Sequence, residues 1–254
     1  MENFLLYDDE RINDINDKLK LIEKKNGLTF GTDAYMLSAF IRAQKKARAA
    51  ELGSGTGIIS LLCAAREKFS HITAIEIQSE FSSLAERNIL LNSLTDKITP
   101  LCADIREVDS QSTFGELDVV FSNPPYMSKD SGKRNLADEK HIARHEVCGN
   151  INDFCKSAER LLKFGGLFYC VYRPDRLCDL ICSLRNNNLE PKKITFICAD
   201  TKTPPSIVLI EAKKGASPSL ALTKSIYIYK DTNENGQRIM TEEADMIYKT
   251  GAID

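Results

Sequence analysis

The chain has 254 residues, of which 43% are hydrophobic and 28% charged, and its formal net charge is −2. This balance is typical of a globular protein and excludes disordered and fibrous classes. The length suffices to bury a core without disulfides or a structural metal. No apolar run approaches the roughly 18 residues of a membrane span, and the acidic start of the chain lacks the basic segment of a signal peptide. We therefore expect a cytoplasmic protein without membrane contact.

Charge and cysteine content narrow the function further. The slightly negative net charge argues against a polycation that binds duplex nucleic acid over its whole surface, but it leaves room for a local basic patch. Arg42, Lys45, Lys46 and Arg48 form such a cluster, which could equally complement the end of a helix. The eight cysteines include no Cys-x-x-Cys pair, so we expect buried thiols and no metal site.

The hydrophobic pattern predicts a hairpin and a helix, followed by alternating strands and helices. Asn26-Gly27 favours a tight turn, so residues 19–30 are expected to form the hairpin, and residues 33–46 the first helix. The following strands are expected at 49–52, 71–77, 97–103, 117–121, 167–172, 194–199 and 207–212. The helices between them are expected at 58–68, 79–94, 151–163 and 175–185.

Several residues mark the expected ends of these elements. Ser79 is a natural N-cap, Gly165-Gly166 is typical of a helix C-cap, and Pro174 suits the start of a helix. Most expected strands are near-continuous apolar runs, which indicates burial on both faces of a largely parallel sheet covered by helices. We expect the last two strands, at 194–199 and 207–212, to pair with each other and complete the sheet. The sequence therefore predicts an α/β fold.

A glycine-rich loop joins the first expected core strand to its helix, in the order Gly53-Ser54-Gly55-Thr56-Gly57. Glycines let the backbone approach a ligand closely, and the N-terminus of the following helix offers unpaired N–H groups. A tight structural turn uses the same residues. The spacing also differs from the Gly-x-Gly-x-x-Gly of dinucleotide-binding folds. The loop indicates a ligand site but does not define the ligand.

Two carboxylates follow the next two strands. Glu76 interrupts an otherwise apolar stretch 19 residues beyond Gly57, where a carboxylate can accept hydrogen bonds from both hydroxyls of a ribose. Asp104 ends the next strand, where it either accepts from an exocyclic amine or is a surface turn residue. The carboxyl ends of parallel strands meet at one edge of a sheet, so both side chains are expected beside the glycine loop.

The most specific pattern is Asn123-Pro124-Pro125-Tyr126 after the fourth core strand. Two prolines cannot continue a central strand, so the chain must leave the sheet through a stiff turn. This turn would hold the Asn123 side-chain oxygen and the Pro124 carbonyl as two acceptors for one –NH₂ group. The Tyr126 ring would offer a surface on which a planar substrate stacks. The tetrapeptide therefore predicts chemistry on a planar amine.

In this order and at these strand ends, the motifs resemble those of class I S-adenosylmethionine-dependent methyltransferases that act on planar –NH₂ groups. Within this class the chain resembles the bacterial tRNA (adenine-N6)-methyltransferases that modify adenine 37 of a valine tRNA. Phe30-Gly-Thr-Asp-Ala34 and Ala143-Arg-His-Glu146 carry this narrower resemblance, which continues through residues 226–229. It implies a Rossmann-like class I methyltransferase fold, with a mostly parallel seven-stranded sheet flanked by helices and an antiparallel strand near the C-terminal end.

The resemblance also implies a cofactor, a partner and site residues. The cofactor is S-adenosyl-L-methionine and its product S-adenosyl-L-homocysteine, the substrate is tRNA, and the protein is a monomer or weak homodimer that needs no metal. Residues 1–30 would form an N-terminal hairpin segment, 31–215 the methyltransferase domain and 216–254 a C-terminal extension packed on it. The implied catalytic residues are Asn123, Pro124, Pro125 and Tyr126. The implied cofactor-binding residues are Thr32, Asp33, Glu51, Gly53, Ser54, Gly55, Gly57, Glu76, Ile77, Asp104, Ile105 and Asn123.

Four cations after the tetrapeptide are candidates for substrate binding. Lys133 and Arg134 face either phosphates or solvent, because acidic residues lie among them. Arg144 and His145 either contact the RNA or form ion pairs with Glu146 at the start of a helix.

Three alternative functions stay open on the sequence alone. A protein glutamine N5-methyltransferase uses the same tetrapeptide but normally carries a separate N-terminal helical domain. An rRNA adenine or guanine N-methyltransferase would share the core motifs. A nucleotide-binding Rossmann protein or oxidoreductase is disfavoured by the glycine spacing and by the Asn-Pro-Pro-Tyr tetrapeptide.

Overall fold

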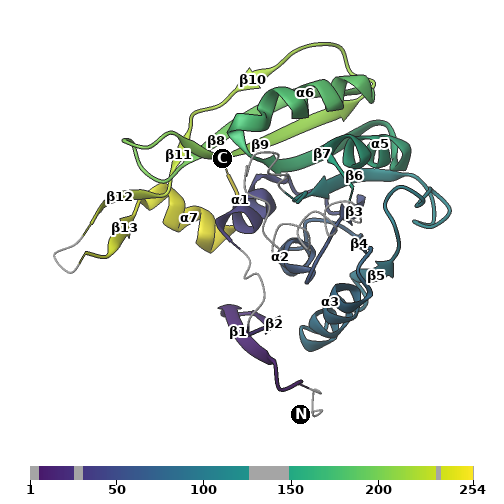
Figure 1. Cartoon of the computed structure of the whole chain (residues 1–254), viewed down its shortest axis with the longest axis horizontal. Coiled ribbons are helices and arrows are strands. Elements are labelled where there is room, and N and C mark those ends of the chain that lie inside the picture. The colour runs from purple at the N-terminus through teal and green to yellow at the C-terminus, as the bar shows by residue number, and fades with distance from the viewer. Residues whose placement is uncertain (1–5, 26–30, 126–148, 233–235, 254) are drawn as a thin grey trace, which may run out of the picture.

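The computed structural model describes residues 6–25, 31–125, 149–232 and 236–253 (Figure 1). Within these residues, nine strands form one central sheet. Seven of them are β3 (Arg48–Leu52), β4 (His71–Glu76), β5 (Ile98–Cys102), β6 (Leu117–Ser122), β7 (Leu162–Tyr172), β8 (Leu189–Cys198) and β9 (Pro205–Lys214). The other two are the short β10 (Ala221–Leu222) and β11 (Ile226–Tyr227).

The strand order is β10-β8-β9-β7-β6-β3-β4-β5, and β11 also pairs with β8. Strands β3 to β7 run parallel to their neighbours in this group, whereas β9 is antiparallel to both β7 and β8. The expected fold class is therefore confirmed: a mostly parallel Rossmann-like sheet with an antiparallel strand near the C-terminal end. The short β10 and β11 extend the expected seven strands at one edge.

Helices cover both faces of this sheet. One buried cluster joins the sheet to α1 (Thr32–Phe40), α2 (Ile58–Ala65), α3 (Ser79–Leu91) and α7 (Glu242–Thr250), and the other joins it to α5 (Ile151–Leu161) and α6 (Leu177–Asn186). The neighbours Val120 and Phe121 on β6 belong to opposite clusters and are both fully buried. Burial on both faces explains why the core strands read as continuous apolar runs.

The N-terminal hairpin differs from the expected one. Residues 19–24 do form a strand, β2 (Leu19–Lys24), but its partner is the preceding β1 (Glu10–Asn16), and the expected Asn26-Gly27 turn lies outside the described residues. The turn instead follows Asn16, whose side-chain oxygen accepts hydrogen bonds from the N–H groups of Lys18 and Leu19 at 2.9 and 3.0 Å. This Asx turn, rather than Asn-Gly, sets the hairpin.

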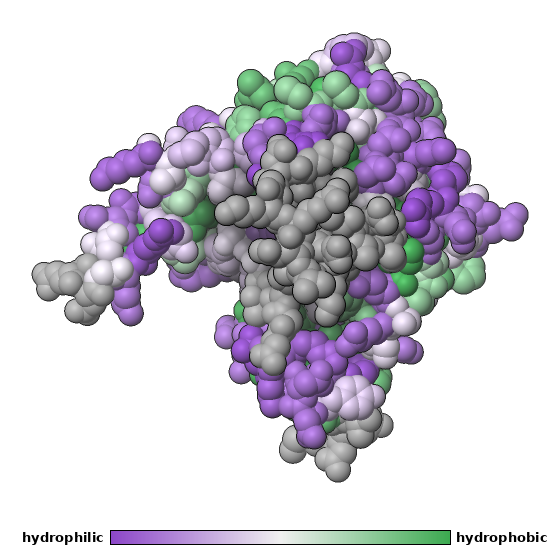
Figure 2. All heavy atoms as spheres, in the orientation of Figure 1, coloured by the Kyte–Doolittle hydropathy of each residue, from purple (hydrophilic) through white to green (hydrophobic). Residues whose placement is uncertain are grey.

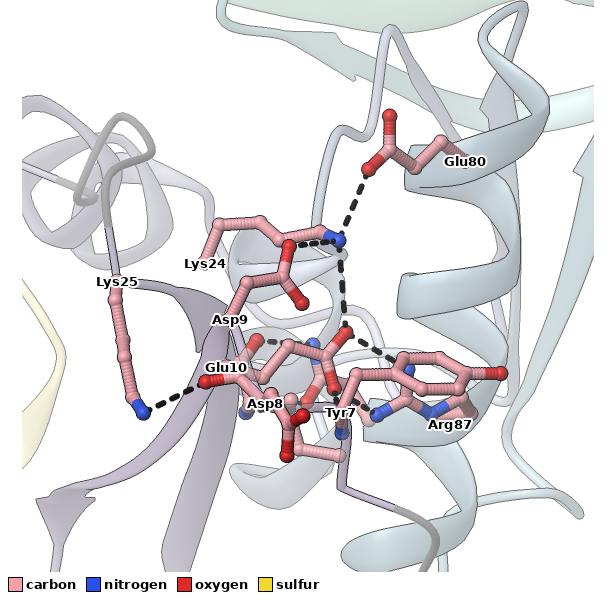
Figure 3. A network of polar contacts seen from close by, with 10 residues as sticks. Tyr7, Asp8, Asp9, Glu10, Lys24, Lys25, Glu80 and Arg87 are labelled. Atoms are coloured by element: carbon pink, nitrogen blue, oxygen red, sulfur yellow. Dashed lines mark hydrogen bonds and ion pairs between the residues drawn. The ribbon is translucent and has the colours of Figure 1, made fainter.

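A network of charged side chains fastens this hairpin to α3 (Figure 3). Glu10 is buried and receives two hydrogen bonds from the Arg87 guanidinium, which lowers the pKa of Glu10. Lys24 lies 2.8 Å from an Asp9 oxygen and 3.0 Å from a Glu80 oxygen. The fork of hydrogen bonds from Arg87 orients the hairpin on the helix because it fixes direction as well as distance.

The first helix ends six residues earlier than expected. Helix α1 stops at Phe40, and Ile41 is extended. The cause is tertiary: the buried Lys68 ammonium donates to the carbonyls of Ser38 and Ile41 at 2.6 and 2.5 Å and so binds the end of the helix. Burial lowers the pKa of Lys68, because removal from water disfavours the charged form.

Because α1 ends at Phe40, the cluster of Arg42, Lys45, Lys46 and Arg48 does not lie in the last turn of a helix, where it was expected. Arg42 pairs with Glu211 at 2.9 Å, and Arg48 donates to the carbonyls of Thr113 and Phe114. Arg48 begins β3, so the cluster lies toward the amino ends of the parallel strands. The sequence could not show this because the positions of the cations depend on where α1 ends.

Other boundaries are also corrected. Gln78, not Ser79, is the N-cap of α3, and no side-chain hydrogen bond caps that end. Helix α5 ends at Leu161, so Gly165 and Gly166 lie inside β7 rather than at a helix C-cap. The pairing of β6 with β7 shifts register beside them, and Gly165 has φ +77°, which suits an irregularity in the strand. Pro174 opens a 3₁₀ turn that precedes α6.

The cysteines are only partly as expected. Cys63, Cys155, Cys170 and Cys198 are buried, but Cys102 and two cysteines on α6 are exposed.

Apolar residues reach the surface over α6, whereas hydrophilic side chains cover much of the rest of the same view (Figure 2). Of the helices in the described residues, none is long and apolar enough to cross a membrane.

The capping role of Lys68 is testable. Lys68→Met should lower the free energy of unfolding by about 2–4 kcal/mol, since buried carbonyls at the end of α1 lose a charged donor. Lys46→Met, on an exposed neighbour, serves as the control and should change it by less than about 0.5 kcal/mol. Urea denaturation measures both. Equal stability of the two variants would show that the carbonyls do not depend on Lys68.

Candidate functional site

A cavity of about 430 Å³ opens where the carboxyl ends of β3, β4, β5 and β6 meet. The loops after these strands line it together with the first turns of α1, α2 and α3 and one residue of α5. Many of the site residues expected from the sequence meet here: Asp33, Glu51, Gly53, Ser54, Gly55, Glu76, Ile77, Asp104, Ile105, Asn123 and Pro125. Residues from four strand ends and the start of α1 thus surround one space.

Other expected residues lie elsewhere. Thr32, Gly57 and Pro124 are not among the residues that line the cavity. Gly57 is the N-cap of α2 with φ +83°, so its role in the structure is to start the helix in a left-handed conformation. Tyr126, Lys133, Arg134, Arg144 and His145 lie outside the described residues.

Two glycines of the loop have different surroundings. A Cβ at Gly53 would lie 3.3 Å from the ring of Phe154, and φ there is +70°. Nothing lies within 4 Å of the position that a Cβ would take at Gly55. The loop therefore needs glycine at Gly53 for packing and conformation, while the space at Gly55 is available to a ligand.

Glu76 holds this loop in place. Its carboxylate is nearly buried and accepts hydrogen bonds from the N–H groups of Gly55 and Gln78, each at 2.9 Å. These bonds explain how a carboxylate can end a buried strand without a cationic partner. Each carboxylate oxygen has more than one acceptor position, so Glu76 can accept from a ligand hydroxyl while it holds the loop.

Asp104 is held by a residue that the sequence did not single out. The Arg106 Nε donates to both Asp104 oxygens at 2.9 Å, and its Nη2 donates to Oδ2 at 2.5 Å. This pairing lowers the pKa of Asp104. Asp104 therefore remains a charged acceptor at the rim of the cavity, with its orientation set by a bidentate contact.

Glu51, the residue before the last one of β3, is fully buried. Its Oε2 accepts from the Ser60 N–H at 3.0 Å and from the Ser60 hydroxyl at 2.5 Å. Burial raises the pKa of Glu51 to about 8, against the effect of these hydrogen bonds. Glu51 thus lines the cavity as a carboxyl group that readily keeps its proton near neutral pH, and a cationic ligand would favour its charged form.

Two further features of the cavity suit a ligand with polar and apolar parts. The Ser54 hydroxyl is buried and has no hydrogen-bond partner within the described part of the chain. Phe81, Phe154, Ile58 and Ile59 contribute apolar walls. The sequence analysis missed these four residues, because an apolar residue on a helix gives no signal that separates a cavity wall from the core.

Asn123 lines the cavity directly after the end of β6. The hydroxyl of the preceding Ser122 donates to the Leu52 carbonyl at 2.7 Å, which ties the end of β6 to the end of β3. The Asn123 Nδ2 donates to Asp33 Oδ2 at 3.1 Å. The acceptor Oδ1 therefore faces away from Asp33. Pro124 and Pro125 follow directly, so the backbone at this point has little freedom.

Comparisons with known proteins agree with this architecture. The family model described as the methyltransferase small domain matches residues 25–179. The chain belongs to this family. A relative from Bacteroides fragilis (strain YCH46), named tRNA1(Val) (adenine(37)-N6)-methyltransferase, is 27% identical over 220 residues, which cover 87% of this chain and 85% of the relative.

Two solved structures share the fold. One is described as a predicted O-methyltransferase, Atu636 of Agrobacterium tumefaciens, with a TM-score of 0.68, 20% identity, and coverage of 88% of this chain and 98% of that one. The other is a putative class I S-adenosylmethionine-dependent methyltransferase of Listeria monocytogenes, with a TM-score of 0.55, 16% identity, and coverage of 79% and 68%. The protein is an S-adenosylmethionine-dependent methyltransferase, and the expected cofactor is confirmed.

The polar and apolar groups that line the cavity match those of this cofactor. Its unpartnered Ser54 hydroxyl and the open face at Gly55 accommodate polar atoms, and its apolar walls accommodate a base. We propose that Glu76 accepts from the ribose hydroxyls and Asp104 from the adenine amine. Glu51 would favour the positively charged end of the cofactor.

Substitution of Glu76 tests the ribose assignment. Glu76→Ala should weaken S-adenosylmethionine binding by about 1–3 kcal/mol, because charge-assisted hydrogen bonds are lost. Glu76→Gln, which keeps one acceptor, should give an intermediate loss. Glu86→Ala, on the exposed side of α3, is the control. Calorimetric affinities that are equal in all three variants would remove Glu76 from the cofactor site.

The shifted Glu51 titration predicts a pH dependence of stability. The folded protein keeps the Glu51 proton up to about pH 8, whereas the unfolded chain releases it near the ordinary value of 4.5. The folded state therefore binds more protons between these values, and the free energy of unfolding falls as the pH rises through this window. Glu51→Gln lacks this titration, so wild type should lose stability relative to it across the window. A pH series of urea denaturations that shows a constant difference would contradict the shift.

Proposed function

We propose that this methyltransferase transfers a methyl group to the exocyclic N6 amine of an adenine in tRNA, namely adenine 37 in the anticodon loop of a valine tRNA. The observation that carries the proposal is that Asn123 lines the cofactor cavity and is followed by two prolines. Support for the narrower substrate comes from the name of the Bacteroides fragilis relative and from its coverage of most of both chains.

The proposed chemistry is positioning of an amine. Asn123 Oδ1 and the Pro124 carbonyl accept the two N–H bonds of the adenine –NH₂, which draws electron density toward its nitrogen and aims it into the cavity. S-adenosylmethionine, when bound, supplies a methyl group that its sulfonium activates. The N–C bond forms as the C–S bond breaks, and the proton of the amine leaves to water. The products are S-adenosylhomocysteine and N6-methyladenine.

A loop base suits this site better than a paired one. An adenine must leave its stack to enter the opening, and this costs less in a single-stranded loop than in a duplex. We propose that Lys133, Arg134, Arg144 and His145, which follow the tetrapeptide in the chain, contact the RNA around that base. The cluster that includes Arg42 and Arg48 is not part of this proposal, because it lies toward the amino ends of the strands.

The activity is tested directly with radiolabelled S-adenosylmethionine and tRNA that lacks the modification. Label should enter the tRNA, and mass spectrometry of its nucleosides should show N6-methyladenosine. Label in a protein substrate but not in RNA would favour a glutamine methyltransferase. Methylated guanine, or label confined to ribosomal RNA, would replace the proposed substrate.

Asn123→Ala tests the role of the acceptor. Loss of one preorganised hydrogen-bonding group should reduce the turnover rate by about 10²–10³, while the affinity for S-adenosylmethionine changes little, because the glycine loop and Glu76 are untouched. Asn186→Ala, at the exposed end of α6, is the control. Normal turnover by Asn123→Ala would show that the amine is not bound through this side chain.

A further inference from the structure

Asn123 contacts a carboxylate from a distant part of the chain. Its Nδ2 donates to Oδ2 of Asp33, in the first turn of α1, at 3.1 Å. Both residues line the cofactor cavity. The resemblance implied cofactor binding for Asp33, but this contact gives it a different partner, the side chain that the proposed function makes an acceptor for the substrate amine.

An asparagine amide can occupy nearly the same space in two orientations. With Oδ1 toward the substrate it accepts from an –NH₂ group, but when it is rotated by 180° it presents Nδ2, so that a donor faces a donor. A carboxylate can only accept, so a neighbouring Asp33 selects the orientation in which Nδ2 points at it. The opposite orientation would set Oδ1 against a carboxylate oxygen.

We propose that Asp33 is a positioning residue that fixes the amide orientation of Asn123 and so keeps Oδ1 directed at the substrate amine. This inference rests on the proposed role of Asn123 as acceptor. It gives a reason for an aspartate at the start of α1: the position beside Asn123 Nδ2 calls for a group that can only accept a hydrogen bond.

Asp33 is itself held firmly. Its Oδ1 accepts from the Ala34 N–H at 2.9 Å, at the N-terminus of α1, where the helix dipole favours a negative charge. A Cβ on Gly31 would lie 2.9 Å from the same oxygen, so glycine leaves room for the carboxylate. One oxygen is thus used by the helix and the other by Asn123.

The C-terminal extension braces the same turn. Tyr248 on α7 lies within hydrogen-bond reach of Thr32, the residue before Asp33. The Tyr248 ring packs against that of Tyr35, with 4.8 Å between centroids. Thr32 is therefore placed to support the position of Asp33 from outside the cavity. Through these contacts a helix outside the family match of residues 25–179 packs against the turn that carries Asp33.

The first test needs neither cofactor nor RNA. In Asn123→Asp, two carboxyl groups replace a pair whose atoms are 3.1 Å apart, and like charges this close cannot both ionise freely. Carbon-13 NMR titration should show the pair releasing one proton well above the usual range of aspartate. The swapped variant Asp33→Asn/Asn123→Asp restores one carboxylate and one amide, so the high titration should disappear. Ordinary titration of both groups in Asn123→Asp would overturn the contact.

The second test separates positioning from cofactor binding. Asp33→Ala should lower kcat by about 10- to 100-fold, with the dissociation constant of S-adenosylmethionine within about twofold of wild type. Asp33→Asn should lose less, because an amide at position 33 can still accept from Nδ2. A large loss of cofactor affinity with unchanged kcat would make Asp33 a cofactor ligand and overturn the inference.

The swapped variant decides whether Asp33 acts through Asn123. It should turn over faster than Asn123→Asp alone, because a carboxylate at position 123, held by an amide donor at position 33, still accepts from the substrate. If the rate losses of the two single variants multiply in the swapped variant, the two residues have independent roles and the inference is contradicted. If wild type methylates no tRNA, the proposed substrate fails, while the NMR titration still reports on the contact.

Discussion

The parallel register of β3 with β4 and β6 is the constraint on which the site depends. Leu52 pairs with Ile75 on one side and with Ser122 on the other, so the three strands end at nearly the same level. The Ser122 hydroxyl, bonded to the Leu52 carbonyl, fixes this level at the catalytic loop. A slip of one residue would turn the side chains of β6 to the opposite face and would carry Asn123 away from the glycine loop.

Around this edge the protein places carboxylates and supports them mainly with backbone and hydroxyl donors. Glu76 is bonded to two N–H groups, and Glu51 to the N–H and hydroxyl of Ser60. Neither has a cationic partner among these hydrogen bonds. Such sites suit a cationic ligand, because neutral donors orient the carboxyl groups without placing a competing positive charge beside them. S-adenosylmethionine, with its sulfonium, is a ligand that this arrangement suits.

The N-terminal hairpin of β1 and β2 and the C-terminal helix α7 are held to the rest of the protein by different interactions. The hairpin depends on the pairing of the buried Glu10 with Arg87 on α3 (Figure 3). Helix α7 depends on ring packing and on Arg66, whose guanidinium fills the space in which Gly251 lacks a side chain. The hairpin is thus held to α3, and α7 packs on α1.

The sequence by itself determined the fold class and the residues that gather at the strand ends, because burial on both faces and the strand-end motifs are local patterns that the sheet then brings together. Only the tertiary structure decided that β1 is the partner of β2 and that Lys68 ends α1 at Phe40. It also decided that Asp33 faces Asn123, and that Phe81 and Phe154 are cavity walls. These features depend on contacts between residues far apart in the chain or on the choice between two equally plausible local structures, and neither leaves a periodic or compositional signal.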